Sequence, residues 1–307
     1  MHRLSTIALA MLIALGAHTA SAQSVAFTFD DAPNMQTLPR LTAAQRNAAM
    51  LAALAKHKVK AALFVTAGYG ADQPPGNALV RAWGEAGHVI GNHTMTHPDL
   101  NSEAVSLAQY QKEILDCDAI IRPMPGYRKW YRFTFLREGK TPEKRDGMRQ
   151  FLAQQGYRNA YVSLDTSDWR LEEKLLDVLE KNSKADITPI KTAYLAHVRQ
   201  RAIAYRALSQ QVQGRDIAQV ILLHHNLINA LWLDDVIAQF KEMGWTIITP
   251  DAAFQDPVYA LQPVSNVAGQ SILLSMARSL GLGKFPGWER LVDDGDTEIE
   301  ALKGSAF

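Results

Sequence analysis

The stretch VAFTFDDAP, residues 25–33, is an apolar run that ends in two adjacent acids, Asp30 and Asp31. A short apolar run closed by polar residues is typical of a buried strand followed by a turn. Adjacent side chains on an extended strand point to opposite faces, so we expect the pair where the strand breaks into its loop. There, one carboxylate could bind a metal while the other faces a water molecule. On the pair alone, a turn or a helix-capping acid pair is the favoured interpretation.

A second polar cluster lies in GNHTMTHPDL, residues 91–100. His93 and His97 have a spacing that puts two imidazoles on one side of a helical turn and is common in metal sites, although no Glu follows His93 as in HExxH proteases. One Asp and two His with open positions form the ligand set of a hydrolytic zinc centre. Asn92 and Thr94 could hold the ring nitrogens that do not bind metal. Two ordinary structural histidines are an equally common origin of this spacing.

Composition favours one α/β domain without a nucleic-acid or membrane-surface role. The 307 residues carry a formal net charge of +1 at pH 7, which gives no electrostatic case for nucleic acid or an anionic membrane as a partner. Cys117 is the only cysteine, so an intrachain disulfide is excluded. A chain of this length can bury a sizeable core in one large α/β domain or in two small ones, and the lack of an internal repeat or low-complexity linker favours one domain.

Residues 1–22 have the pattern of a secretory signal peptide, with a cationic start, an apolar run over residues 7–16 and small residues before Gln23. We therefore expect an exported protein, periplasmic or secreted. After cleavage, the mature chain of residues 23–307 would have no stable membrane anchor. An uncleaved anchor is the alternative.

Short apolar runs alternate with helical patterns along the chain. Strands are expected near residues 25–29, 61–65, 88–91, 130–133, 160–164, 220–223 and 245–248. Helices are expected near residues 42–57, 77–86, 102–121, 142–155, 189–212 and 230–243. Strands that alternate with helices over short loops predict parallel βαβ units. About seven strands favour a barrel-like closure over an open sheet.

Polar segments follow the ends of the predicted strands. In an α/β barrel these ends line one face, where catalytic residues collect. The pattern therefore gathers one set of residues at one mouth: Asp30, His93, Arg132, Asp168 and His224. We interpret residues 23–255 as one catalytic domain. Residues 256–307 form a C-terminal extension, with a helix near 271–280 on the barrel exterior and a mobile acidic end.

Three further segments are each weak signals by themselves: YRFTFLREG (131–139), DTSDW (165–169) and LLHHN (222–226). An Arg near aromatic residues is usually a packed or surface cation. Together with TFDD (28–31) and HTMTH (93–97), however, the five segments occur in an order that resembles the five motifs of the polysaccharide deacetylase family. This family is also called the NodB-homology group or carbohydrate esterase family 4. The resemblance covers about residues 24–250.

The resemblance implies a distorted (β/α)7-type barrel of parallel strands in a single domain. It also implies one divalent metal, usually Zn²⁺, held by Asp31, His93 and His97. Asp30 would be the general base, and Arg132 would pair with it and keep it ionised.

The same resemblance assigns the other half of the site. His224 would be the general acid, with Asp168 orienting or charging it. Trp169 and Leu222 would line the acetyl pocket, and the backbone N–H of Phe135 would help to hold the oxyanion.

The chain departs from the family pattern in the third motif, where Thr134 stands in place of the usual Pro. We therefore expect the loop with the oxyanion donor to be less rigid. His225 follows the expected acid, and we favour His224 as the inward residue because its spacing matches the Leu-x-His motif. Arg137 and Glu138 could contact a sugar or form a surface ion pair.

The expected function is that of an exported, metal-dependent hydrolase that removes N-acetyl groups from an N-acetylated glycan of the chitin, peptidoglycan or exopolysaccharide type. Two alternatives stay open: an O-acetyl esterase or amidase with a small acylated substrate, and a glycan-binding protein without catalysis. A glycosidase is weaker, because it would leave His93 and His97 without a role. The particular glycan and the oligomeric state stay open at this point.

Overall fold

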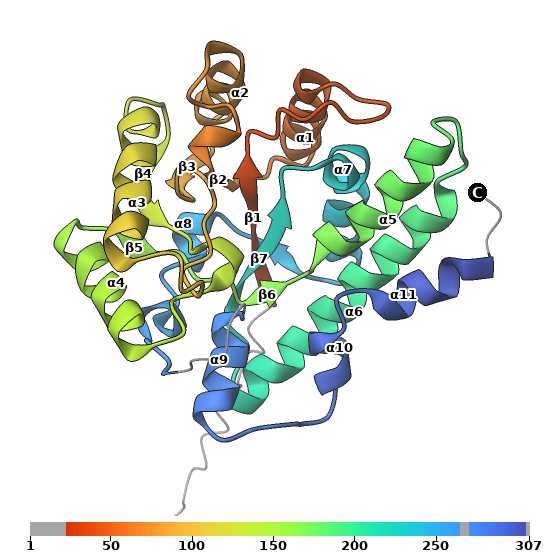
Figure 1. Cartoon of the computed structure of the whole chain (residues 1–307). Helices are drawn as coiled ribbons and strands as arrows, with labels where there is room; N and C mark the ends of the chain where they lie inside the picture. Colours follow the sequence, from red (N-terminus) through yellow and green to blue (C-terminus); the bar gives the residue numbers. More distant parts are fainter. Residues whose placement is uncertain (1–22, 265–269, 305–307) are drawn as a thin grey trace, which may run out of the picture.

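A curled sheet of parallel strands lies at the centre of the molecule, with helices around it (Figure 1). The structure is a computed structural model that describes residues 23–264 and 270–304, so the expected signal peptide lies outside the described residues. The strands are β1 Ser24–Ala32, β2 Ala62–Val65, β3 Val89–Asn92, β4 Tyr127–Tyr131, β5 Arg158–Asn159, β6 Leu164–Asp165, β7 Ala218–His224 and β8 Thr246–Ile247.

The strand order is β5-β4-β3-β2-β1-β7-β6, and β8 pairs with β1. Every strand pair is parallel, and among the described strands no pairing joins β5 to β6. The predicted distorted (β/α)7-type barrel with parallel strands in a single domain is therefore confirmed. β1 is buried on both faces, as parallel strands covered by helices are.

The helices that connect the strands are α1 Ala43–His57, α2 Pro74–Glu85, α3 Leu107–Ile121, α4 Pro142–Gln154, α5 Asp168–Lys181, α6 Thr188–Gln213 and α7 Leu227–Glu242. Short turns follow β2 and β4, namely η1 Ala67–Tyr69 and η2 Thr134–Leu136. After β8 come α8 Pro250–Ala253, η3 Pro257–Ala260, α9 Ile272–Ser279, α10 Trp288–Val292, α11 Asp296–Ala301 and η4 Leu302–Gly304. Among the described helices, none has the length and apolar character needed to cross a membrane.

Besides shifts of up to three residues at the ends of other elements, three elements differ from the sequence-based expectation. The expected strand 160–164 is replaced by two short strands, β5 and β6, on either side of residues 160–163. The helix expected from residue 102 begins at Leu107, because Ser106 and Gln109 form a capping box. Helix α5 was not predicted, although its buried apolar residues recur at helical spacing: Leu171, Leu175, Val178 and Leu179.

The C-terminal segment packs against α6. The helix expected near residues 271–280 is α9, which contacts α6. The acidic end was expected to be mobile, but it contains α10 and α11, and both contact α6. In Figure 1, α5, α6, α10 and α11 lie together on one side of the sheet.

Candidate active site and metal centre

The two acids of the opening segment lie at an irregularity at the end of β1. The pairing of β1 with β2 shifts register between Phe29 and Ala32, and Asp31 has a φ of +66°. The left-handed backbone of Asp31 interrupts the alternation of an extended strand, so both carboxylates can face the same site. The acids therefore lie in the last residues of the strand, not in the loop after it.

The two histidines follow β3 in a loop, not on a helical turn as their spacing suggested. His93 Nδ1 lies 2.8 Å from the Arg132 carbonyl oxygen, which therefore accepts its proton and leaves Nε2 with a lone pair. Asn92 and Thr94 do not orient the rings as expected. Asn92 Oδ1 accepts the Thr94 N–H at 2.9 Å, and the Thr94 hydroxyl accepts the His97 N–H at 3.0 Å, so these side chains brace the loop backbone.

Asp31, His93 and His97 form a candidate metal centre. One ligand atom from each residue lies within 4.8 Å of the others. Asp31 Oδ1 is 3.5 Å from His93 Nε2 and 3.3 Å from His97 Nε2, and among the described residues no hydrogen bond reaches this buried oxygen. Burial lowers the pKa of His93 and of His97. Two neutral imidazoles and a carboxylate oxygen without a hydrogen bond are the donor set of a hydrolytic zinc site.

Asp30 and Arg132 form a buried ion pair beside this triad. Arg132 Nη1 lies 2.7 Å from Asp30 Oδ1, and both side chains are almost fully buried. Arg132 is itself held by the Ala160 carbonyl at 3.0 Å and lies over the Phe64 ring. Burial raises the pKa of Asp30 to about 6, although the Arg132 charge acts in the opposite direction. Arg132 thus favours the ionised form, as expected, but burial has the larger effect.

His224 and Asp168 form a second pair at the end of β7. His224 is the register partner of Asp30, and its Nδ1 lies 2.6 Å from Asp168 Oδ1. Asp168 Oδ2 also accepts the His224 N–H and an Asn229 side-chain N–H. Burial alone would lower the pKa of His224, but the Asp168 carboxylate more than offsets this and raises the pKa to about 10. The imidazole is therefore cationic at neutral pH.

His225 points away from this pair. Its Nε2 lies 3.0 Å from the Asn47 side-chain oxygen, and its Nδ1 accepts the Asn34 N–H at 3.3 Å. Burial lowers the pKa of His225 to about 4, so it is neutral. The His225 side chain therefore links the loop after β7 to α1, and of the two imidazoles it is that of His224 whose charge acts on the Asp30 carboxylate.

Phe135 lies next to the metal centre in the turn η2. Its ring is 4.4 Å from the His97 ring and 48% exposed, and its φ is +55°. The preceding residue, Thr134, is fully buried, and its hydroxyl bonds to the Tyr110 hydroxyl at 2.8 Å and to the Pro98 carbonyl. Hydrogen bonds thus take the place of the proline ring that the family pattern has here.

We predict that Thr134→Val lowers the free energy of unfolding by about 1–3 kcal/mol, because it leaves the buried Tyr110 hydroxyl and Pro98 carbonyl with one partner fewer. Urea denaturation measures the change. Thr192→Val is the matched control, since Thr192 is exposed on α6 and should lose much less. Equal losses in the two variants would show that the Thr134 hydrogen bonds do not hold this loop.

The remaining expected site residues differ in exposure. Leu222 is buried in β7, whereas Trp169 is 41% exposed at the start of α5. Arg137 pairs with Asp99, and Glu138 pairs with Arg149 at 2.7 Å, so each of the two residues forms an ion pair.

The sequence analysis missed Tyr69. This residue is 40% exposed in η1, and its ring stacks on His97 with centroids 6.1 Å apart. Burial and then the Asp31 charge raise the pKa of Tyr69 to about 12. Tyr69 follows the end of β2, so a survey of every strand end for aromatic as well as ionisable side chains would have found it.

The fold and the site together define a class of protein. It is an α/β barrel with a candidate hydrolytic metal centre at its strand ends, accompanied by the pairs Asp30–Arg132 and Asp168–His224. A family model described as polysaccharide deacetylase matches residues 17–160, just under half of the chain, and over these residues the chain is similar to that family. The matched residues include Asp30, the candidate metal ligands and Arg132, but not Asp168 or His224. The roles expected for Asp168 and His224 therefore rest on the sequence pattern and on the geometry described above.

Curated relatives with deacetylase names are similar to part of this chain. A peptidoglycan-N-acetylglucosamine deacetylase of Bacillus cereus is 31% identical over 146 residues, which are 48% of this chain and 46% of the relative. A chitooligosaccharide deacetylase of Sinorhizobium fredii is 38% identical over 101 residues, 33% of this chain and 40% of the relative. The chain thus spans less than half the length of these two relatives.

Solved structures show the same fold. A chitin deacetylase from the fungal pathogen Colletotrichum lindemuthianum is 19% identical, with a TM-score of 0.52 over 76% of this chain and 88% of that chain. A protein of Bacillus anthracis described as a CE4 family pseudoenzyme is 16% identical, with a TM-score of 0.52 over 76% of this chain and 66% of that chain. Because a pseudoenzyme shares the fold, activity must be argued from the site residues.

Proposed function

We propose that this chain is a metal-dependent hydrolase that removes N-acetyl groups from an N-acetylated glycan. One observation carries the proposal: the candidate metal ligands are accompanied by two buried pairs, Asp30–Arg132 and His224–Asp168. In the first pair Asp30 is ionised at neutral pH, and in the second His224 is protonated. The pKa of Asp30 is about 6 and that of His224 about 10. At neutral pH the first is a carboxylate base and the second a cationic acid, which is the division of roles that amide hydrolysis requires.

The chemistry follows from these roles. Asp30 accepts a proton from the water that attacks the acetamide carbonyl carbon. The backbone N–H of Phe135 donates to the carbonyl oxygen as it becomes negative, an interaction of a kind that contributes about 3–4 kcal/mol. His224 donates its proton to the nitrogen as the C–N bond breaks, and Asp168 stabilises the imidazolium until then. The products are acetate and the free amine of the sugar.

Asp31, His93 and His97 would hold the metal in this proposal, and Zn²⁺ is the ion that suits their donor set. When bound, such an ion polarises a carbonyl and lowers the pKa of a water ligand. Leu222 and Trp169 would enclose the acetyl methyl group, with Leu222 as the buried wall. Arg132 would hold Asp30 in place through their ion pair.

We also propose that the protein is exported, on the basis of the signal-peptide pattern of residues 1–22 alone. N-terminal sequencing of the protein from a periplasmic or culture-medium fraction tests this. A mature chain that begins at Gln23 is the expected result, and a chain that keeps residues 1–22 contradicts it.

An acetate-release assay tests the activity. The purified mature chain, loaded with Zn²⁺, is expected to release acetate from N-acetylglucosamine oligomers and to stop when a chelator is added. Acetate release only from O-acetylated xylan or small acetyl esters would instead support the esterase alternative. Binding of the oligomers without acetate release from any substrate would support a non-catalytic glycan-binding protein.

Asp168→Asn should move the alkaline limb of the pH profile of kcat to lower pH. Without the Asp168 charge, burial dominates and lowers the pKa of His224, so the protonated acid is lost at lower pH than in the wild type. We expect kcat at pH 8 to fall by about 10²-fold or more. The pH dependence of kcat measures both effects, with Asp177→Asn on the exposed face of α5 as the control. An unchanged alkaline limb would exclude His224 as the acid.

The same pair should contribute to stability in a defined pH range. The folded-state pKa of His224 lies above its ordinary value of 6.5. The contribution is therefore fully present below about pH 6.5 and is lost as the pH rises to about 10. Thermal unfolding between these two pH values should show a decline in the wild type that is smaller in Asp168→Asn.

A further inference from the structure

The loop between β6 and α5 ends just before Asp168, and its last residue has an unusual backbone conformation. Ser167, the residue directly before Asp168, has a φ of +48°, which a residue with a side chain rarely adopts. Such a conformation persists only where the surrounding structure holds it. The position of Asp168, and through it that of His224, therefore depends on what contacts residues 165–167.

Two buried side chains of α6 form hydrogen bonds to this loop. Arg201 donates from Nε to the Asp165 carbonyl at 2.9 Å and from Nη2 to the Ser167 hydroxyl at 2.8 Å. His197 Nε2 lies 2.7 Å from the Thr166 carbonyl oxygen. Arg201 is 1% exposed and His197 is 3% exposed, so neither can exchange these partners for water. Each of the three residues before Asp168 thus has a contact from α6.

The C-terminal segment supplies the other half of these contacts. Arg201 Nη1 donates to the Arg290 carbonyl at 2.8 Å, and the Ser167 hydroxyl donates to Asp294 Oδ1 at 2.6 Å. Glu298 Oε2 lies 3.2 Å from His197 Nδ1. Removal of these partners would leave buried polar groups of Arg201 and His197 unsatisfied, which is costly.

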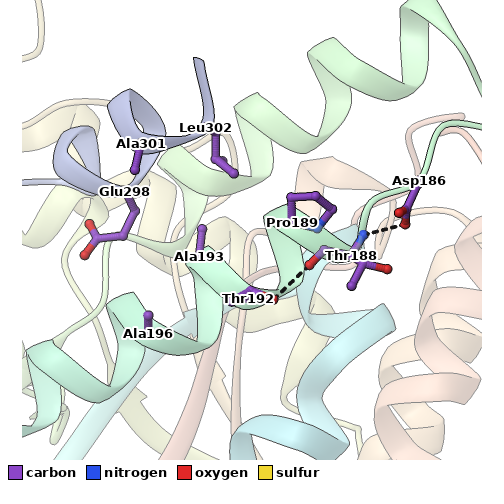
Figure 2. Close-up of a pocket in the computed structure, with 9 residues that line it drawn as sticks. All are labelled: Asp186, Thr188, Pro189, Thr192, Ala193, Ala196, Glu298, Ala301 and Leu302. Atoms are coloured by element: carbon purple, nitrogen blue, oxygen red, sulfur yellow. Dashed lines mark hydrogen bonds between the residues drawn. The ribbon is translucent and has the colours of Figure 1, made fainter. Parts of the chain in front are cut away.

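Apolar packing and polar contacts together set the position of this segment. Leu291 of α10 is buried in the hydrophobic core, whereas none of the residues of α11 is buried. A groove of about 510 Å³ separates α11 from part of α6, with Glu298, Ala301 and Leu302 on one side and α6 residues on the other (Figure 2). The hydrogen bonds of Arg290, Asp294 and Glu298 therefore couple the C-terminal segment to the loop that precedes Asp168.

We propose that Arg290, Asp294 and Glu298 form a positioning element for the Asp168–His224 pair, and that this element acts through Arg201, His197 and Ser167. The inference rests on the proposed function, because it matters for catalysis only if His224 is the acid. The element lies outside the family match, which ends at residue 160. A small displacement of Asp168 would change both the orientation and the charge of His224, and a misplacement of about 1 Å can cost about 10²-fold in rate.

Asp294→Ala in the full mature chain is the main test, with Asp296→Ala as its matched control. Both acids lie in the same segment, and Asp294 is 49% exposed and Asp296 69% exposed, but Asp296 pairs with Arg170 at the surface. We expect Asp294→Ala to lower kcat by about 10-fold to 10²-fold with KM unchanged, and to move the alkaline limb to lower pH. Asp296→Ala should have the kcat, the KM and the alkaline limb of the wild type.

A double-mutant cycle identifies the contact responsible. Ser167→Ala and Asp294→Ala remove the same hydrogen bond, so their effects on kcat should be less than additive when combined. Arg201→Lys should retain more activity than Arg201→Met, because a lysine keeps a cation near the loop. Arg206→Met is the control on α6, since Arg206 pairs with Asp216 near the surface.

A measurement without substrate separates this inference from the proposed function. His224 faces the carboxylates of Asp168, Asp30 and Asp31, and its titration can be followed by NMR of the 15N-labelled imidazole. In Asp294→Ala the midpoint should move to lower pH, even if the wild type released no acetate. If the midpoint, kcat and the alkaline limb all stay as in Asp296→Ala while only the melting temperature falls, the segment is a structural brace and the inference is overturned.

Discussion

Asp30→Asn should lower kcat for acetate release by about 10²–10⁴-fold, the range for loss of a general base. The amide has nearly the same shape as the carboxylate and can still accept the Arg132 hydrogen bond, but it cannot take a proton from water. KM should change little, because no binding contact to the glycan is assigned to Asp30. The measurement is steady-state acetate release at saturating Zn²⁺ across pH 5–9, a range chosen to bracket the pKa of about 6.

Two controls accompany this variant. Circular dichroism must show a folded chain, because a buried Arg132 with a neutral partner is destabilising. The bound metal per chain must equal that of the wild type, since Asp30 is not a proposed ligand. A folded, metal-loaded Asp30→Asn protein with wild-type kcat would remove Asp30 from the mechanism.

Asp31→Asn and His97→Ala should each lose the bound metal and with it essentially all acetate release. Both residues supply atoms of the triad, and the triad offers three ligand atoms in all, so the loss of one leaves too few for tight binding. Bound zinc per chain, measured by elemental analysis after dialysis, gives the result directly. Treatment of the wild type with a chelator should abolish acetate release, and added Zn²⁺ should restore it.

A thermal-shift measurement provides a readout independent of activity. A metal that binds only the folded state raises the melting temperature of the wild type, whereas Asp31→Asn should not respond. His57→Ala is the control for the loss of a histidine, because His57 pairs with Asp234 and lies outside the triad. Zinc retained at wild-type stoichiometry in Asp31→Asn and His97→Ala would refute the assigned metal centre.

The barrel and the members of the site could be read from the sequence because both depend on local patterns. Apolar runs with polar ends predict strands and the mouth at which they meet, and parallel strand ends do meet at one edge. Helix α5 was missed although its apolar residues, such as Leu171 and Leu175, have helical spacing. The start of α3 was misplaced because the capping box at Ser106 was overlooked.

Several properties of the site depend on contacts between distant residues. Asp30 and Arg132 are 102 residues apart in the chain, and the pKa of Asp30 follows from how deeply this pair is buried. The spacing from Leu222 favoured His224 over His225, but the contacts that separate the two histidines come from distant residues, Asp168 beside His224 and Asn47 beside His225.

Which residues meet at the mouth of the barrel follows from the order of the chain, because each strand end presents the residues that come directly after its apolar run. How these residues work together follows from contacts between distant segments. The left-handed turn at Asp31 lets two adjacent acids face one site, and Ser167 is held by Asp294, 127 residues away. Backbone strain and burial are set by the whole packed chain, so no local pattern contains them.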